Sequence, residues 1–417
     1  MTDDVLVVRR RDFQVIGLVS IGHFFSHLYQ VALPFLFPLI HADEGISYTR
    51  LGLLVTVFYA VSGFSQTPAG ILVDRFGARR VLVAGFGLLI TATSLYGFAP
   101  NYAALVVLAA AAGLGNSVFH PCQFSVLSAT ISEPRMGRAY SFHSFGGFLG
   151  YAAAPTIMGL IAPGLGWRTS IIIVGLVGFA ALAVVALFST GFRDSSHIRA
   201  ELGLKDTPAA PLLSVLGPAI VLSFMFFMFA AGGQSGLQSS GPAALIGAFE
   251  TSYSQAAFAF SCFLIAAPTG ILTGGVLVDW KPTVAGVTAN EVGITMGAFS
   301  IAAAMILVVS LTTLAPIWIS ALLGVAGFFY GLASPSRDLL TRAVVPPGSS
   351  GKVFGFVYSG LDAGSATTPV IFGWLIDHDL PRIVFMLAAG LIVAATICIL
   401  TTRRFMPASR APERQQT

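Results

Sequence analysis

Long runs of apolar residues constrain this chain more than any other feature of its sequence. Residues 81–98, 103–118, 171–187 and 383–400 are four examples, and such runs approach or reach the about 20 residues that a helix needs to cross a bilayer. Only 10% of the residues are charged, whereas soluble proteins carry about 25%. The strands of a membrane barrel would instead show alternating patterns of about ten residues. The sequence therefore predicts an all-α membrane protein.

The apolar runs predict twelve transmembrane helices in two sets of six. The first set covers 13–40, 51–73, 81–98, 103–128, 138–162 and 168–190, and the second covers 216–241, 255–278, 289–312, 316–340, 352–376 and 382–402. A polar stretch separates the sets. We therefore predict an N-terminal six-helix bundle over 1–190, a cytoplasmic linker over 191–212, and a C-terminal six-helix bundle with a short cytoplasmic tail over 213–417.

Lysine and arginine fall almost entirely on one side of the predicted membrane. With both termini in the cytoplasm, 19 of the 22 lie on the inner side, and only Arg50, Arg168 and Arg382 lie on the outer side. This asymmetry follows the positive-inside rule. It also accounts for the net charge of +4 and the pI near 9.1, so we expect a lipid bilayer and no nucleic acid as the partner.

The two halves repeat each other. At an offset of 214 residues, Pro121 matches Pro335 and Gly150 matches Gly364. An offset of 205 pairs Asp74 with Asp279, and a weaker match at 208 pairs Gln30 with Gln238. Further pairs at 214 are Gly113 with Gly327, Gly146 with Gly360, Pro155 with Pro369, Gly159 with Gly373, and Arg168 with Arg382. Two six-helix halves related by an axis along the membrane normal are typical of transporters.

Several motifs carry a resemblance to a known family. "GILVDRFGARR" (70–80) resembles the loop 2–3 signature of the major facilitator superfamily, and the twelve spans are similar to that superfamily over nearly the whole chain. Within it, the first half resembles the fosmidomycin-resistance group in "GHFFSHLYQ" (22–30), "GLGNSVFHP" (113–121) and "FGGFLGYAAAPTIMGLI" (145–161). The resemblance implies two pseudo-symmetric bundles in a bacterial inner membrane.

The loop 2–3 phrase predicts a gate. Gly70 and Gly77 allow close packing and a tight turn, and Asp74 at the inner membrane edge suits the positive N-terminal ends of spans 5 and 11. The resemblance implies that Asp74 latches the start of span 11 near Lys352, and by pseudo-symmetry Asp279 would latch the start of span 5. The basic members of the phrase are Arg75, Arg79 and Arg80. The alternative is a generic positive-inside turn.

Span 5 resembles the antiporter signature of the superfamily. Gly150, Pro155 and Gly159 match it and predict a tightly packed, bent helix. Ala154 and Met158 replace two of its glycines, and this departure weakens the inference of an exporter.

Polar residues at membrane depth are costly and are therefore functional candidates. His23, His27 and Gln30 share one face of span 1, and either line a substrate or proton pathway or form a neutral structural pair with a polar neighbour. Two histidines are too few for a metal site, so we expect no metal. His120 in span 4 and His143 in span 5 have the same two interpretations.

The second half carries more charge at membrane depth. Arg337 and Asp338 in span 10 form a structural ion pair, contribute to the inner gate, or face the pathway. Asp362 in span 11 is a candidate for proton coupling or for substrate binding. Gln234 and Gln238 in span 7 either face the pathway or form a polar helix end that leads into a loop.

Together these features predict a proton-coupled secondary transporter that works by alternating access. The resemblance favours export of a small drug or metabolite, and the alternative is uptake of a small organic anion, since a buried arginine suits a carboxylate. No GxxxxGK phosphate loop and no nucleophile–base cluster stand out in the sequence. We therefore expect no enzyme activity and no cofactor, and we expect a monomer with protons as the coupling ion.

Overall fold

The computed structural model describes residues 3–131, 133–194, 216–280, 288–343 and 350–405, and in this part of the chain all regular structure is helical. Side chains at several helix ends are also outside the described part, among them those of Asp279, Asp338 and Lys352. The roles predicted for these three residues therefore stay predictions. The chain forms two compact units, Met1–Pro208 and Ala209–Thr417.

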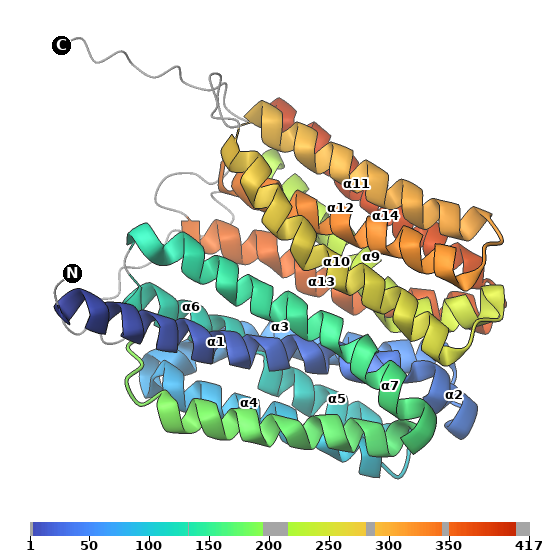
Figure 1. Ribbon diagram of the computed structural model, residues 1–417, viewed down its shortest axis with the longest axis horizontal. Coiled ribbons are helices and arrows are strands. Elements are labelled where there is room, and N and C mark those ends of the chain that lie inside the picture. The colour runs from blue at the N-terminus through green and yellow to red at the C-terminus, as the bar shows by residue number, and fades with distance from the viewer. Residues whose placement is uncertain (1–2, 132, 195–215, 281–287, 344–349, 406–417) are drawn as a thin grey trace. The chain divides into compact units, whose positions relative to one another are not determined.

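The N-terminal unit is a bundle in which α1 and the first part of α7 lie side by side (Figure 1). Its helices are α1 (Asp3–Phe35), α2 (Phe37–Glu44), α3 (Tyr48–Phe76), α4 (Ala78–Leu95), α5 (Tyr102–Asn116), α6 (Phe119–Thr130) and α7 (Glu133–Phe188), with the short η1 (Tyr96–Phe98) after α4. Helices α4 and α5 pack together, and α3 packs on α5. The order confirms the six predicted spans, with two of them joined in α7.

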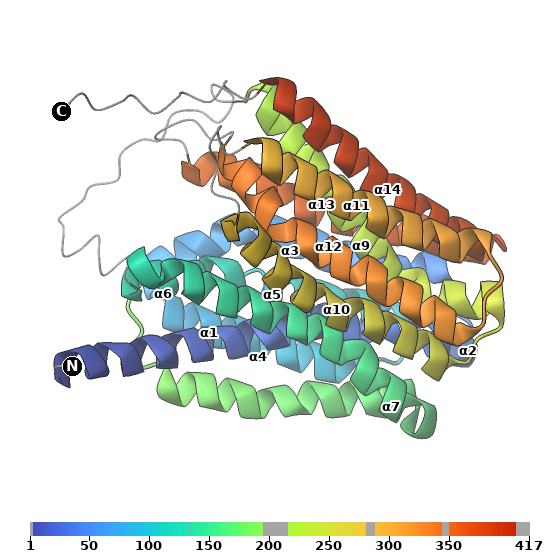
Figure 2. The ribbon, with the colours of Figure 1, turned by 45° about the horizontal axis from the view of Figure 1, so that its top comes forward.

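The C-terminal unit is built in the same way. Its helices are α9 (Pro218–Phe249), α10 (Tyr253–Trp280), α11 (Thr288–Leu311), α12 (Pro316–Ala343), α13 (Ser350–Asp377) and α14 (Pro381–Thr402), followed by η3 (Arg403–Phe405). Helix α12 packs on α10 and α11, and α9 packs on α13 and α14 (Figure 2). The pairing of α9 with α13 repeats the pairing of α1 with α7.

Nine segments of the described chain are long and apolar enough to cross a membrane. One of them, Phe142–Phe188, contains two predicted spans. Helices α3 and α13 are not among the nine, but they occupy the predicted spans 2 and 11. The described helices thus account for all twelve predicted spans.

Proline and glycine explain where these helices break. Pro121 has no N–H to donate to the carbonyl of Ser117 four residues earlier, and span 4 divides there into α5 and α6. Pro38 lies in the first turn of α2, where a missing N–H leaves no bond unmade. Within α7, Gly166 has φ +73° and separates the two spans.

The internal repeat is confirmed by the way the helices touch. A Cβ at Gly150 would collide with the carbonyl of Phe24, and one at Gly364 would collide with the carbonyl of Met228. These collisions show backbone-to-backbone contact of α7 with α1 and of α13 with α9. The matched pair Gly113 and Gly327 makes equivalent approaches, to Phe58 and to Phe263.

The same contacts correct one detail of the repeat. Because Phe24 and Met228 stand opposite matched glycines, the first helices of the two units correspond at an offset of 204. This offset pairs Gln30 with Gln234. The weaker match at 208, which pairs Gln30 with Gln238, does not describe the packing.

Candidate functional site

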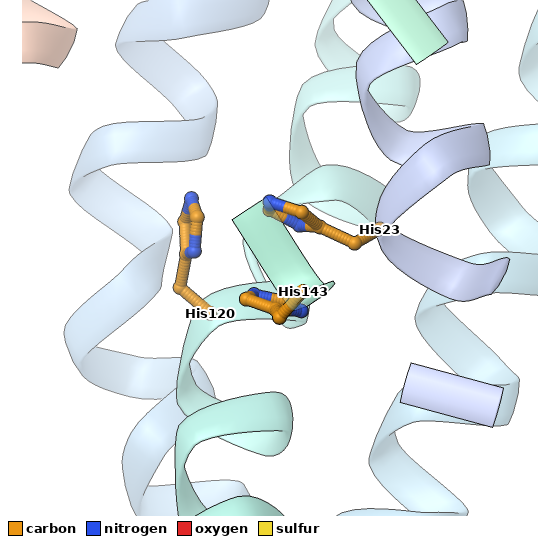
Figure 3. Close-up of side chains that lie close together, drawn as sticks. All are labelled: His23, His120 and His143. Carbon is orange, nitrogen blue, oxygen red and sulfur yellow. The ribbon is translucent and has the colours of Figure 1, made fainter. Parts of the chain in front are cut away.

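Four histidines meet inside the N-terminal unit, although three helices supply them. His23 and His27 come from α1, His120 from α6 and His143 from α7. Figure 3 shows His23, His120 and His143 pointing into one space. The His23 ring stacks on His143 with centroids 3.8 Å apart, lies 4.2 Å from His27 and lies 5.5 Å from His120. We name these four residues the histidine cluster.

His23 and His143 of the cluster are buried, whereas His27 and His120 are half-buried. The exposed fraction is 4% for His23 and 2% for His143. The Nδ1 atoms of all four rings, and Nε2 of His143, have no hydrogen-bond partner among the described residues. A Cβ at Gly147 would lie 2.6 Å from His23 Nε2, so this glycine on α7 makes room for the rings. The sequence placed only His23 and His27 together, and the structure adds the other two.

A polar network centred on Gln30 adjoins the histidine cluster. Gln30 Oε1 accepts hydrogen bonds from Tyr151 OH (2.6 Å) and Tyr59 OH (3.2 Å). Its Nε2 lies 3.3 Å from both Asn116 Oδ1 and Ser26 Oγ. The Tyr151 ring also packs on His27, with centroids 4.2 Å apart. Gln30 was predicted from the sequence, whereas Asn116 was not, although it is a lone amide within an apolar run.

A small cavity of about 20 Å³ opens beside Gln30, which is room for about one water molecule. Tyr29, Pro34, Phe58 and Tyr96 are among its lining residues. Gln30 thus contributes an amide to the lining of a mainly apolar hollow.

The C-terminal unit carries charged side chains at membrane depth on α12 and α13. The guanidinium of Arg337 lies over the Phe227 ring, 5.1 Å from its centroid, at a distance typical of cation–π contact. Asp362 is half-buried on α13. It lies two residues from both Gly360 and Gly364, which pack against α9, so it projects from the opposite face of the helix.

Gln234 and Gln238 lie inside a continuous helix. Helix α9 runs on to Phe249, and Gln238 is only 4% exposed. Its Nε2 has no hydrogen-bond partner in the described chain. The interpretation of these residues as a helix end leading into a loop is therefore wrong.

Comparisons with known proteins identify the family to which this chain belongs. The family model described as Major Facilitator Superfamily matches residues 19–290 and 242–417. The chain belongs to the Major Facilitator Superfamily. It is therefore an integral, multi-pass membrane protein of a family of transporters, as its apolar helices indicate.

Individual members of the superfamily are similar over nearly their whole length. The fosmidomycin resistance protein of Escherichia coli is 24% identical, with 96% of this chain and 94% of that protein covered. The probable sulfoacetate transporter SauU of Cupriavidus necator is 25% identical, with 93% and 92% covered. A crystal structure of a bacterial homologue of the human lysosomal transporter Spinster, inward-facing and occupied, has a TM-score of 0.70 at 17% identity, with 94% and 96% covered.

The superfamily's loop 2–3 phrase is a tight turn anchored within its own unit. Gly77 has φ +83° and joins α3 to α4, which confirms the predicted turn. Asp194 Oδ2 accepts a 2.7 Å hydrogen bond from Ala78 N, and Arg79 donates to Ala186 O and to Ser189 Oγ at the end of α7. Asp194 was not predicted as part of this turn, because it lies in the stretch that the sequence assigns to the linker.

The predictions for the remaining residues of the phrase are not confirmed. A Cβ at Gly70 would meet nothing within 4 Å, so the close packing predicted there is wrong. Asp74, Arg75 and Arg80 are exposed, and Arg75 lies near the Phe76 ring. The latch between Asp74 and span 11 stays a prediction.

Span 5 of this superfamily member packs as predicted at Gly150, where α7 approaches α1. Pro155 and Gly159 lie within the helical part of α7, and the non-helical backbone inside this helix is at Gly166. A functional bend around Pro155 and Gly159 stays a prediction.

Proposed function

We propose that this chain is a proton-coupled secondary transporter that moves a small organic molecule by alternating access. The observation that carries the proton coupling is Asp362. It is a carboxylate between two glycines that pack α13 onto α9, on the opposite side of the helix. In the described part of the C-terminal unit, α13 packs mainly on α9.

A carboxylate on this face of α13 needs a polar environment, because lipid hydrocarbon does not stabilise its charge. A carboxylate at membrane depth costs about 2.5–3.5 kcal/mol on insertion scales when it faces lipid. A face that meets the water-accessible path of a transporter removes this cost, and there the carboxyl group can gain and lose a proton.

The substrate and direction follow from similarity and remain our proposal. The relatives are named for resistance to fosmidomycin and for sulfoacetate. Export of a drug or metabolite is the first candidate. Uptake of a small organic anion is the second, and Arg337 favours it, because a guanidinium recognises carboxylates and sulfonates.

We also propose the surroundings and the gate. The chain acts as a monomer in a bacterial inner membrane with both termini in the cytoplasm, as the basic residues indicate. Asp74 latches the inner side against the start of span 11. Reporter fusions after the last span test the orientation, since activity of a periplasm-dependent reporter there would reverse it.

Proteoliposomes that contain the purified chain and an internal pH dye test the proton coupling. Fosmidomycin, sulfoacetate and related organic acids are added outside, and uptake of labelled compound is measured in parallel. An export pump that exchanges substrate for protons makes the interior alkaline as substrate enters, whereas a symporter makes it acidic. We expect Asp362→Asn to abolish substrate-driven proton movement.

Asp379→Asn is the matched control. Asp379 is exposed beyond the end of α13 and has φ +58°, a conformation that asparagine also adopts. The control should keep the wild-type proton flux. Substrate entry without proton movement in the wild type, or unchanged flux in Asp362→Asn, would overturn the proposed coupling.

A further inference from the structure

We propose that His23, His120 and His143 bind a divalent transition-metal ion, with zinc as the reference ion. Because the sequence shows only two neighbouring histidines, in span 1, it predicted no metal. The structure brings histidines from α1, α6 and α7 together (Figure 3). This inference rests on the N-terminal unit alone and does not depend on the proposed proton coupling.

The geometry is close to that of a metal site. One ring nitrogen from each histidine lies within 4.8 Å of the other two. In a tetrahedral zinc site with Zn–N bonds of about 2.0–2.1 Å, ligand nitrogens are ~3.4 Å apart. Coordination requires the stacked His23 and His143 rings to turn, because each nitrogen binds a metal through the lone pair in the plane of its own ring. Gly147, which lies against His23 and His27, has no side chain to block such a turn.

Buried imidazole nitrogens without hydrogen-bond partners also support a bound ion. The unpartnered Nδ1 atoms of His23, His120 and His143 each leave a polar atom unsatisfied, as does Nε2 of His143, within the described chain. Such buried atoms destabilise the folded chain when nothing pairs with them. A metal ion would use one nitrogen of each ring.

A neighbouring amide can support the ligands. Gln123 donates its Nε2 hydrogen to Val19 O, one turn before His23 on α1. Its Oε1 is buried and has no partner among the described residues. Metal-bound histidines usually donate their second N–H to such an acceptor, which fixes the ring and its tautomer.

The ligand chemistry selects the class of ion. The cluster offers neutral imidazole and no carboxylate, a set that suits zinc, nickel, copper or cobalt and not magnesium or calcium, which take oxygen ligands. Three histidines leave a fourth position of the tetrahedron open. His27, whose ring centroid is 4.2 Å from that of His23, is placed to fill it or to border it.

Zinc binding to the full chain in detergent tests the proposal directly. The protein is purified with an affinity tag that contains no histidine, stripped with a chelator, and dialysed against zinc chloride. We expect one zinc per chain by elemental analysis. X-ray absorption should show a nitrogen shell at about 2.0–2.1 Å, which no general loss of folding can mimic.

Substitutions then assign the ligands. His23→Asn, His120→Asn and His143→Asn should each weaken zinc binding by more than the roughly 10–100-fold typical of outer-shell changes, and Gln123→Ala should fall within that range. His378→Asn is the matched control, because His378 is exposed just beyond the end of α13. Its described contacts are a hydrogen bond to Trp374 O and stacking on the Trp374 ring.

Several outcomes would overturn the proposal. They are a wild-type chain that binds no zinc, a triple variant of the three histidines that keeps its zinc, and an equal loss in His378→Asn. Elution and thermal melting of every variant show whether it has folded. A hydrated cluster without metal would appear as the first of these outcomes.

Discussion

The two units share a backbone framework but fill it with different chemistry. Arg168 donates to the carbonyls of Gly97 and Ala99 at the end of the third span. Its match Arg382 donates in the same way to the carbonyls of Ser310 and Thr312. In both units, therefore, a matched arginine provides hydrogen bonds to the backbone carbonyls at the end of the third span.

The polar side chains inside the framework differ. At the offsets that the packing supports, 204 for the first helix and 214 for the fourth and fifth spans, the histidine cluster has no counterpart. Its four positions correspond to Phe227, Ala231, Ser334 and Val357. Asn116 corresponds to Tyr330, whose OH donates to Ala230 O. The comparison teaches that small residues at helix contacts preserve the fold, while the groups that can bind ions or substrates are specific to each unit.

The largest effect should come from the shared framework. Gly150→Ala and Gly364→Ala each force a methyl group against a backbone carbonyl of the neighbouring helix. Backbone cannot move aside as a flexible side chain can, so we expect each change to cost at least the 1–3 kcal/mol of core overpacking. Thermal melting in detergent measures the loss, and the two variants should resemble each other.

Gly390→Ala is the control for this pair. Gly390 lies exposed on α14 and a Cβ there would meet nothing within 4 Å. Alanine is the better helix former by about 0.5–1 kcal/mol, so this variant should be neutral or more stable. If Gly150→Ala were tolerated and Gly364→Ala were not, the two contacts would not be equivalent and the comparison would fail.

A smaller and unequal effect is expected at Asn116 and Tyr330. Asn116 accepts from Ser26 and Gln30 and donates to Ser62. Asn116→Ala leaves buried partners unsatisfied and should cost about 1–3 kcal/mol. Tyr330→Phe removes one hydrogen bond, so its cost should stay near 0.5–1.5 kcal/mol in the same melting measurement. Equal losses would show that the amide network contributes no more than a single bond.

The contrast between the two units also shows which features could be predicted from the sequence. Membrane spans, the two halves and the superfamily follow from apolar runs, basic residues and repeated glycines, because these patterns are local or periodic. The turn at Gly77 and the contact at Gly150 follow in the same way, since glycine marks close approach and positive φ. Such features need only the spacing along one helix or between two matched helices.

What the sequence could not supply depends on contacts between distant residues. His120 and His143 reach the histidine cluster only through the packing of α6 and α7 with α1, and span 4 gives no sign of the direction in which His120 points. The anchor of loop 2–3 is Asp194, more than a hundred residues away. Similarly, the offset of 208 for the first helix rests on matching residue types alone. The helix contacts in the structure correspond to an offset of 204.

The smallest effect is expected at the ion pair that Arg168 adds to its carbonyl contacts in the N-terminal unit. Arg168 pairs with Glu44, and both side chains are about one-third exposed, at 37% and 31%. Exposed pairs contribute about 0–1 kcal/mol, so Glu44→Gln should shift the melting temperature little. Arg168→Ala and Arg382→Ala should cost more, and by similar amounts, because both lose the two carbonyl contacts of the shared framework. A large loss in Glu44→Gln, or a cost at Arg168 far above that at Arg382, would mean that the ion pair and not the carbonyl contacts holds this end of the N-terminal unit.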